Sequence, residues 1–251
     1  MLHKIFFVGG ALIFLLNYFK YRLMLFPDIT NINYTGNYKD IFVDGIHGWL
    51  IHPDKNIKKK NKVILYSHGN AGNIGNRQHL IPKFTNAGYS LLLFDYSGFG
   101  KSSGNLSMKN MYKNANSFVQ YLLEQNFTKD QIILFGESIG CSVAINTAIQ
   151  NDIKYVICQS GPASINHMID KISPYLKPLK ILTKNDFNTL KLLKQKNNQK
   201  ILWLHSKSDE IIPYKQAEQL APFVTEFVEI HGTHNNPLYS IGTIDDFIIN
   251  K

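Results

Sequence analysis

The stretch IILFGESIGCSVAI, residues 132–145, decides the fold of this chain. It opens with four apolar residues, passes through GESIG at residues 136–140, and ends in small and apolar residues. This pattern predicts a buried strand, a sharp turn at Ser138 and a helix directly after the turn. The two glycines of GESIG lack a Cβ atom, so the strand and the helix can approach each other closely.

Ser138 occupies the position that a nucleophilic serine needs. A G-x-S-x-G sequence between a strand and a helix is typical of a nucleophile elbow, in which the hydroxyl projects from a strained turn. The start of the following helix places a positive dipole end beside the oxyanion that forms during attack. The motif alone also fits an ordinary strand–loop–helix turn with a solvated serine, and the residues that follow favour the catalytic interpretation.

A catalytic serine needs a histidine that takes its proton and a carboxylate that orients the histidine. With a nucleophile elbow, these groups follow in the order serine, acid, histidine. Asp209 comes after the apolar run ILWLH, and His234 comes after the last predicted strand. We therefore predict a triad of Ser138, Asp209 and His234. Glu210 is the alternative acid, and His231 is the alternative base.

The oxyanion needs two backbone N–H donors. One is expected at Ile139, directly after the nucleophile. The other is expected in the loop after the strand at residues 62–67, at Asn70 or, as an alternative, at Ala71.

Three further residues could be taken for triad members, namely His68, His205 and Asp95. Each of these histidines precedes its loop at the edge of a strand, which favours a structural role. Asp95 precedes Ser138 in the chain and is expected to tether the glycine-rich loop that follows it.

The rest of the chain alternates between continuous apolar strands and helical stretches. Asp44-Gly45 supplies the turn of a hairpin at residues 40–52. Further strands are predicted at residues 62–67, 90–94, 154–158, 200–205 and 226–230, and helices at 76–87, 107–125, 214–223 and 237–249. Buried strands that alternate with helices predict an α/β fold with a mostly parallel sheet and helices on both faces. Residues 161–199 have no clear role in the sheet and are expected to form a small lid, with a plain crossover as the alternative.

The N-terminus predicts a membrane anchor. Residues 2–19 are apolar apart from His3, Lys4 and Asn17, and Lys20 and Arg22 follow. This length is close to the lower limit of about 17 residues for a membrane-spanning helix. A cleaved signal peptide and a buried helix are alternatives, but no small-x-small cleavage site and no polar face are present. We expect a single-pass signal anchor at residues 1–24 and one catalytic domain at residues 25–251.

Composition restricts the partners of the protein. The chain has 251 residues, 44% hydrophobic residues and a formal net charge of +9. Its lysines do not interleave with a nucleic-acid motif, so no nucleic-acid partner is expected. The lysine cluster at residues 55–62 is expected to be a solvated hairpin tip, with anionic lipid as the alternative contact. Cys141 and Cys158 are expected in the core, and the histidines lack metal-ligand spacing, so no metal is expected.

Five motifs carry a family resemblance: HGNAGNIGNR, DYSGFGKSSG, GESIG, SDEIIP and GTHNN. With them the chain resembles the bud-emergence-type α/β-hydrolases, which are N-terminally anchored serine hydrolases. The resemblance implies an eight-strand α/β-hydrolase fold, the triad predicted above, and a membrane-associated esterase without a cofactor. A related branch removes fatty acyl groups from S-acylated proteins. Glu137, Cys141 and His231 depart from the usual pattern of the family, and no catalytic group is lost.

We therefore expect a membrane-anchored serine hydrolase that cleaves ester or thioester bonds through an acyl-enzyme. A serine peptidase on the same fold is the first alternative, and a non-catalytic binding protein is the second. The sequence defines neither the physiological substrate nor the oligomeric state.

Overall fold

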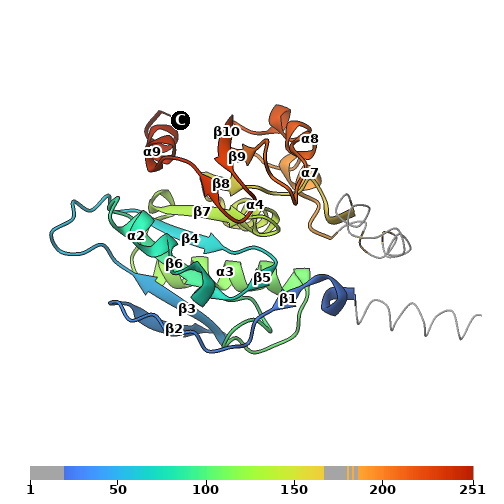
Figure 1. The fold of residues 1–251 in the computed structure, drawn as a ribbon. Helices are drawn as coiled ribbons and strands as arrows, with labels where there is room; N and C mark the ends of the chain where they lie inside the picture. Colours follow the sequence, from blue (N-terminus) through green and yellow to red (C-terminus); the bar gives the residue numbers. More distant parts are fainter. Residues whose placement is uncertain (1–19, 167–179, 181–182, 184–185, 251) are drawn as a thin grey trace, which may run out of the picture.

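A central β-sheet organises the chain in the computed structural model, which describes residues 20–166, 180, 183 and 186–250 (Figure 1). In sheet order its strands are β11 (Pro237–Leu238), β10 (Glu226–Gly232), β9 (Lys200–Ser206), β8 (Tyr155–Gln159), β7 (Ile132–Glu137), β4 (Val63–Ser67), β6 (Ser90–Phe94), β3 (Ile46–Ile51) and β2 (Lys39–Val43). The strands from β10 to β6 are parallel, whereas β11, β3 and β2 are antiparallel to their neighbours. The predicted α/β-hydrolase fold is confirmed, and the two-residue strand β11 extends the expected eight strands to nine within the described residues.

Helices cover both faces of this sheet (Figure 1). They are α2 (Leu80–Thr85), α3 (Met108–Glu124), α4 (Gly140–Asn151), α7 (Thr189–Leu193), α8 (Tyr214–Glu218) and α9 (Ile241–Asn250), with 3₁₀ turns η1 (Ile74–Arg77), η2 (Lys129–Gln131) and η4 (Ala221–Phe223). Strand β4 shows the two-sided burial, because Val63 and Leu65 join the core beneath α3 and α4 while Ile64 and Tyr66 join the core beneath α2 and α9. The continuous apolar strands in the sequence follow from this burial on both faces.

The turn between β7 and α4 is built as the sequence predicts. Ser138 has φ +54°, a backbone conformation that non-glycine residues rarely adopt and that marks strain. A Cβ atom at Gly140 would collide with the carbonyl oxygen of Ser67, and one at Gly136 would collide with the backbone of Cys141. Both glycines are therefore required for α4 to lie so close to β4 and β7.

Two predicted helices have different bounds in the structure. The helix expected at residues 76–87 is divided into η1 and α2, because a start at Leu80 places Pro82 in the first turn, where its missing N–H costs nothing. The helix expected at residues 237–249 begins at Ile241. Its expected first turn instead forms β11, which pairs with the end of β10.

The lysine-rich loop is not a hairpin tip. Strands β3 and β4, which it joins, do not pair with each other, because β6 lies between them in the sheet. Lys55, Lys58, Lys59 and Lys60 are exposed in this loop, as expected for a solvated segment.

The predicted anchor lies largely outside the described residues, and so does part of the predicted lid. Of the anchor, the structure describes residues 20–24. Of residues 161–199, it describes 161–166, 180, 183 and 186–199, including α7. Across the part of the chain that the structure describes, no helix has both the length and the apolar character needed to cross a membrane.

Candidate active site

The predicted nucleophile and base line one cavity at the carboxyl ends of the parallel strands. This cavity has a volume of about 310 Å³, and Ser138, Ile139, Asn70 and His234 are among the residues that line it. Ser138, His234 and Asp209 are each 7% exposed. Loops that follow β4, β7, β9 and β10 therefore bring the predicted site residues to one rim, where ligands bind in open parallel sheets.

His234 is fixed by Asp209. Its Nδ1 lies 2.8 Å from Oδ2 and 3.1 Å from Oδ1 of the Asp209 carboxylate. An ionised carboxylate can only accept hydrogen bonds, so Nδ1 carries the proton and Nε2 is left free to act as a base.

Asp209 is itself held in place by backbone donors. Its Oδ1 accepts hydrogen bonds from the N–H of Ile211 at 2.9 Å and of Ile212 at 2.7 Å. Burial raises the pKa of Asp209, but the His234 hydrogen bond and charge, together with the Ile212 N–H, outweigh burial and hold this pKa below its ordinary value. The carboxylate therefore remains ionised while it orients His234.

The alternative acid and base take other positions. Glu210 accepts a hydrogen bond at 3.0 Å from the backbone N–H of His234, so it braces the histidine loop. His231 lies exposed on β10, opposite Leu238 of β11. The structure thus brings His234 to Asp209 and leaves His231 within a strand.

The other histidines and Asp95 have structural surroundings. His205 is buried and donates from Nε2 to the carbonyl oxygen of Ile212 at 3.0 Å. His68 packs against the ring of Tyr96, and burial lowers its pKa to about 4. Asp95 accepts a hydrogen bond from the N–H of Ile74 at 2.9 Å, so its side chain tethers the loop after β4 and not, as expected, the glycine-rich loop that follows it.

The two predicted oxyanion donors, Ile139 and Asn70, line the same cavity as Ser138. Ile139 precedes the first residue of α4, and its carbonyl oxygen accepts hydrogen bonds from the N–H and the hydroxyl of Ser142. Asn70 lies in the loop after β4 and lines the cavity together with Gly69 and Ala71. Backbone N–H groups near a helix N-terminus are suited to stabilising an oxyanion.

Glu137, directly before the nucleophile, forms a mostly buried ion pair. Its Oε1 lies 3.1 Å from the guanidinium of Arg77, and its Oε2 accepts a hydrogen bond from the Tyr66 hydroxyl at 2.8 Å. Burial raises the pKa of Glu137, but the Arg77 charge and these hydrogen bonds lower it below its ordinary value. The unusual acid in the motif is therefore neutralised where it lies.

Replacing Glu137 with Gln is expected to destabilise the protein by about 3 kcal/mol near pH 7, because it leaves Arg77 buried without its partner. A carboxyl whose pKa is lowered by folding stabilises above its unfolded pKa of about 4.3, and this stabilisation is lost as pH falls through the folded value. The difference between wild type and variant should therefore shrink below about pH 4.

Urea unfolding at pH 7 and at low pH measures this difference. Glu229→Gln is the matched control, because its pair with Lys207 is exposed and should contribute little to stability. A Glu137→Gln variant as stable as the control at pH 7 would contradict the assigned role of the ion pair.

Sequence reasoning missed part of the cavity wall. Pro162 and Ile165 belong to residues 161–199, which were expected to cover the site, whereas Leu23, Met24 and Phe26 from the N-terminal side were not expected to line it. No periodicity in the sequence identifies these contacts, since they join segments that are distant in the chain. The sequence did carry a signal that Glu137 is paired, because a carboxylate at the end of a buried strand needs an opposite charge or hydrogen-bond donors.

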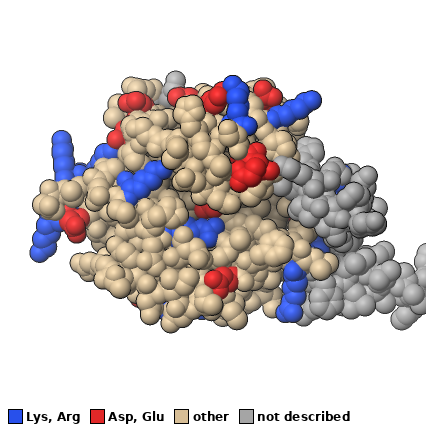
Figure 2. All heavy atoms as spheres, in the orientation of Figure 1, with Lys and Arg blue, Asp and Glu red and all other residues tan. Residues whose placement is uncertain are grey.

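No cluster of three or more potential metal-ligating side chains occurs within the described ranges of the chain. Charged side chains of both signs are interspersed on the face shown in Figure 2.

Comparison with known proteins identifies the family. The family model described as "Serine aminopeptidase, S33" (Hydrolase_4) matches residues 58–220, which is more than half of the chain. The chain belongs to this α/β-hydrolase family. The family match includes the elbow with Ser138 and the loop with Asp209, and it ends before His234.

Individual relatives of this α/β-hydrolase include uncharacterized protein R595 of Acanthamoeba polyphaga mimivirus. It is 35% identical over 213 residues, which cover 75% of this chain and 70% of R595. Protein bem46 of Schizosaccharomyces pombe is 29% identical over 158 residues, covering 61% of this chain and 53% of bem46. The chain thus spans about half the length of bem46 in this match.

A solved α/β-hydrolase from Vibrio vulnificus shares the fold of this chain. It superposes with a TM-score of 0.70 at 18% identity, covering 85% of this chain and 80% of the Vibrio chain.

Proposed function

We propose that this protein is a serine hydrolase that cleaves acyl ester or thioester bonds through Ser138, His234 and Asp209. One observation carries the proposal: Ser138 and His234 line the same cavity, and His234 is held on both oxygens of Asp209. The strained backbone at Ser138 supports it, since such strain is concentrated at functional sites.

The proposed reaction has two steps. Nε2 of His234 takes the proton from the Ser138 hydroxyl as Oγ bonds to the carbonyl carbon, and it then gives that proton to the departing alcohol or thiol. The carbon–oxygen or carbon–sulfur bond of the substrate breaks, which leaves an acyl group on Ser138. A water molecule then repeats the sequence and releases the carboxylic acid. The N–H groups of Ile139 and Asn70 stabilise the oxyanion in both steps.

The cavity wall favours an acyl substrate over a peptide with a free amino terminus. An aminopeptidase needs an unpaired carboxylate to bind the α-ammonium group of its substrate. Among the described residues that line the cavity, Glu137 is the one acid, and Arg77 already neutralises it. Much of the remaining wall is apolar, including Ile165, Ile211 and Ile212.

A substrate comparison tests the proposed reaction against the peptidase alternative. We expect the full chain to hydrolyse p-nitrophenyl acyl esters and acyl thioesters with a much higher kcat/KM than aminoacyl anilides. Cleavage of anilides with a kcat/KM equal to that of the esters would favour the peptidase. A protein that turns over none of these substrates would favour the non-catalytic alternative.

Residues 1–24 are also proposed as a membrane anchor, on the evidence of their apolar sequence. Residues 20–24 contact the catalytic domain: Lys20 is buried and pairs with Asp186, and Tyr21 packs against the core. The spanning part of the proposed anchor therefore comprises residues 2–19. Retention of the full chain in the membrane pellet after alkaline extraction tests this proposal, and its release into the supernatant would contradict it.

A further inference from the structure

Residues 20–28, here called the N-terminal strap, are attached to the loop that is proposed to bind the oxyanion. Strand β1 (Phe26–Pro27) pairs in parallel with β5 (Ala71–Gly72). The side chain of Asn70 donates to the carbonyl oxygen of Met24 at 2.8 Å and accepts from the N–H of Phe26 at 3.3 Å. The strap and the oxyanion loop are thus joined by backbone pairing and by both ends of one amide group.

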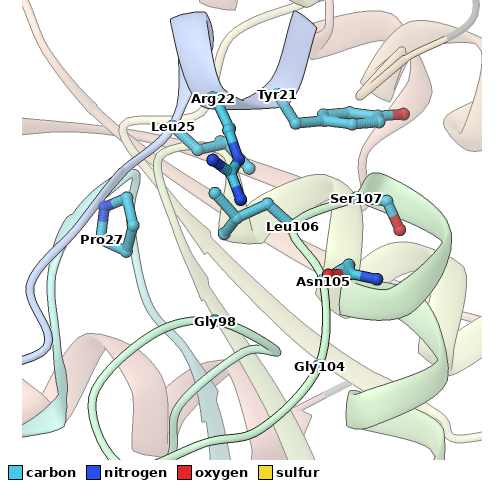
Figure 3. Close-up of a pocket in the computed structure, with 9 residues that line it drawn as sticks. All are labelled: Tyr21, Arg22, Leu25, Pro27, Gly98, Gly104, Asn105, Leu106 and Ser107. Atoms are coloured by element: carbon cyan, nitrogen blue, oxygen red, sulfur yellow. The ribbon is translucent and has the colours of Figure 1, made fainter. Parts of the chain in front are cut away.

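The strap is also held at each of its ends. Lys20 lies 2.7 Å from Asp186 in a mostly buried ion pair, and the carbonyl oxygen of Asp28 accepts a hydrogen bond from the N–H of Gly100 at 2.9 Å. Behind the strap lies a second cavity of about 550 Å³, across which Arg22 and Leu25 face Leu106 (Figure 3). The strap is therefore a thin wall between this second cavity and the catalytic cavity.

The side of the strap that faces the nucleophile is apolar. Leu23, Met24 and Phe26 line the catalytic cavity together with Ile165 and Ile211. Leu23 is 55% exposed, Phe26 is 61% exposed and Ile211 is 37% exposed. Apolar side chains that stand in water next to a reactive serine gain free energy when a hydrocarbon chain covers them.

The size of the cavity lets a long acyl chain reach this rim. A volume of about 310 Å³ is at the lower end of the range of roughly 300–1,000 Å³ for small-molecule sites. A cavity of about 150 Å³ binds benzene with its six carbons, so this space holds an acyl chain of roughly ten carbons whose carbonyl carbon lies at Ser138. Because Leu23 and Phe26 line this cavity and are more than half exposed, the far part of such a chain lies along the rim that they form.

We infer that the N-terminal strap is one wall of an acyl-chain site and determines the preference of the enzyme for long hydrocarbon chains. The inference rests on the proposed acyl hydrolase function. The occupant is an uncharged hydrocarbon chain, because the strap residues that line the cavity, Leu23, Met24 and Phe26, are apolar. Leu23 and Phe26 are specificity-determining residues, and Asn70 positions the strap against the oxyanion loop.

The test is the acyl-chain profile of the full-length chain with p-nitrophenyl esters from acetate to decanoate, below their micelle-forming concentrations. The double variant Leu23→Ser, Phe26→Ser should lower kcat/KM for decanoate about 10- to 100-fold, since apolar contacts discriminate by such factors. Acetate, which does not reach the rim, should be hydrolysed as by wild type. Phe26→Leu, which keeps the rim apolar, should keep the wild-type profile.

Phe42→Ser is the matched control, because Phe42 is 58% exposed on β2 and does not line the cavity. A loss confined to decanoate and to the double variant supports the inference. An unchanged profile in the double variant, or an equal loss of all esters in the double variant, would overturn it while acetate turnover by wild type upholds the proposed function. If wild type hydrolyses no ester, the proposed function fails and the inference fails with it.

Discussion

Replacing Ser138 with Ala is expected to lower kcat for ester hydrolysis by about 10⁴- to 10⁶-fold, the range found when a nucleophile that acts with its base as a unit is removed. In the proposed mechanism the Ser138 Oγ bonds to the substrate carbonyl carbon, so the variant lacks the nucleophile. The cavity and the oxyanion donors would persist, so weak binding of substrate should remain. Steady-state kinetics with a p-nitrophenyl ester measures the loss.

The serine control for this variant is Ser97→Ala. Ser97 is also buried, but its hydroxyl donates to Asn114 and it does not line the catalytic cavity. We expect its kcat to stay within about tenfold of wild type, as for a change that acts on stability alone. A Ser138→Ala enzyme with the kcat of this control would exclude Ser138 as the nucleophile.

Replacing Asp209 with Asn is expected to lower kcat by about 10⁴-fold. The carboxylate accepts the Nδ1 proton of His234 and two backbone N–H groups, whereas an amide would present a donor on one side. The amide would favour the His234 tautomer with its proton on Nε2, and that tautomer cannot accept the proton of Ser138. Substrate binding should change little, so the loss is expected in kcat rather than in KM.

Replacing Glu210 with Gln distinguishes the role of Glu210 from that of the neighbouring acid, Asp209. Glu210 accepts a hydrogen bond from the backbone N–H of His234, whereas Asp209 holds the imidazole ring. Its amide oxygen can keep that hydrogen bond, so the variant should retain kcat within about tenfold of wild type. If Glu210→Gln lost more activity than Asp209→Asn, the acid of the triad would be Glu210.

The elbow could be predicted from sequence because its requirements are local. A buried strand, a turn at φ +54° and two glycines that admit α4 are all encoded within residues 132–145. The positions of Asp209 and His234 could also be predicted, because parallel strands bring their carboxyl ends to one rim.

The contacts of the strap and the partner of Glu137 could not be predicted in this way. Phe26 meets Ala71 across 45 positions of the chain, and Arg77 meets Glu137 across 60. Such contacts depend on how the sheet is assembled, and neither side chain carries a pattern that names its partner. The division of the predicted helix at residues 76–87 has a local cause in Pro82, which sequence reasoning could have weighed.

The central claim is that Ser138 is an activated nucleophile. The most direct measurement is to label the full chain with a fluorophosphonate, which reacts covalently with activated serines, and to locate the adduct by peptide mass spectrometry. We predict a single adduct on Ser138, with no labelling of Ser138→Ala and greatly slowed labelling of Asp209→Asn. An adduct on another serine, or equal labelling of wild type and Ser138→Ala, would contradict the account.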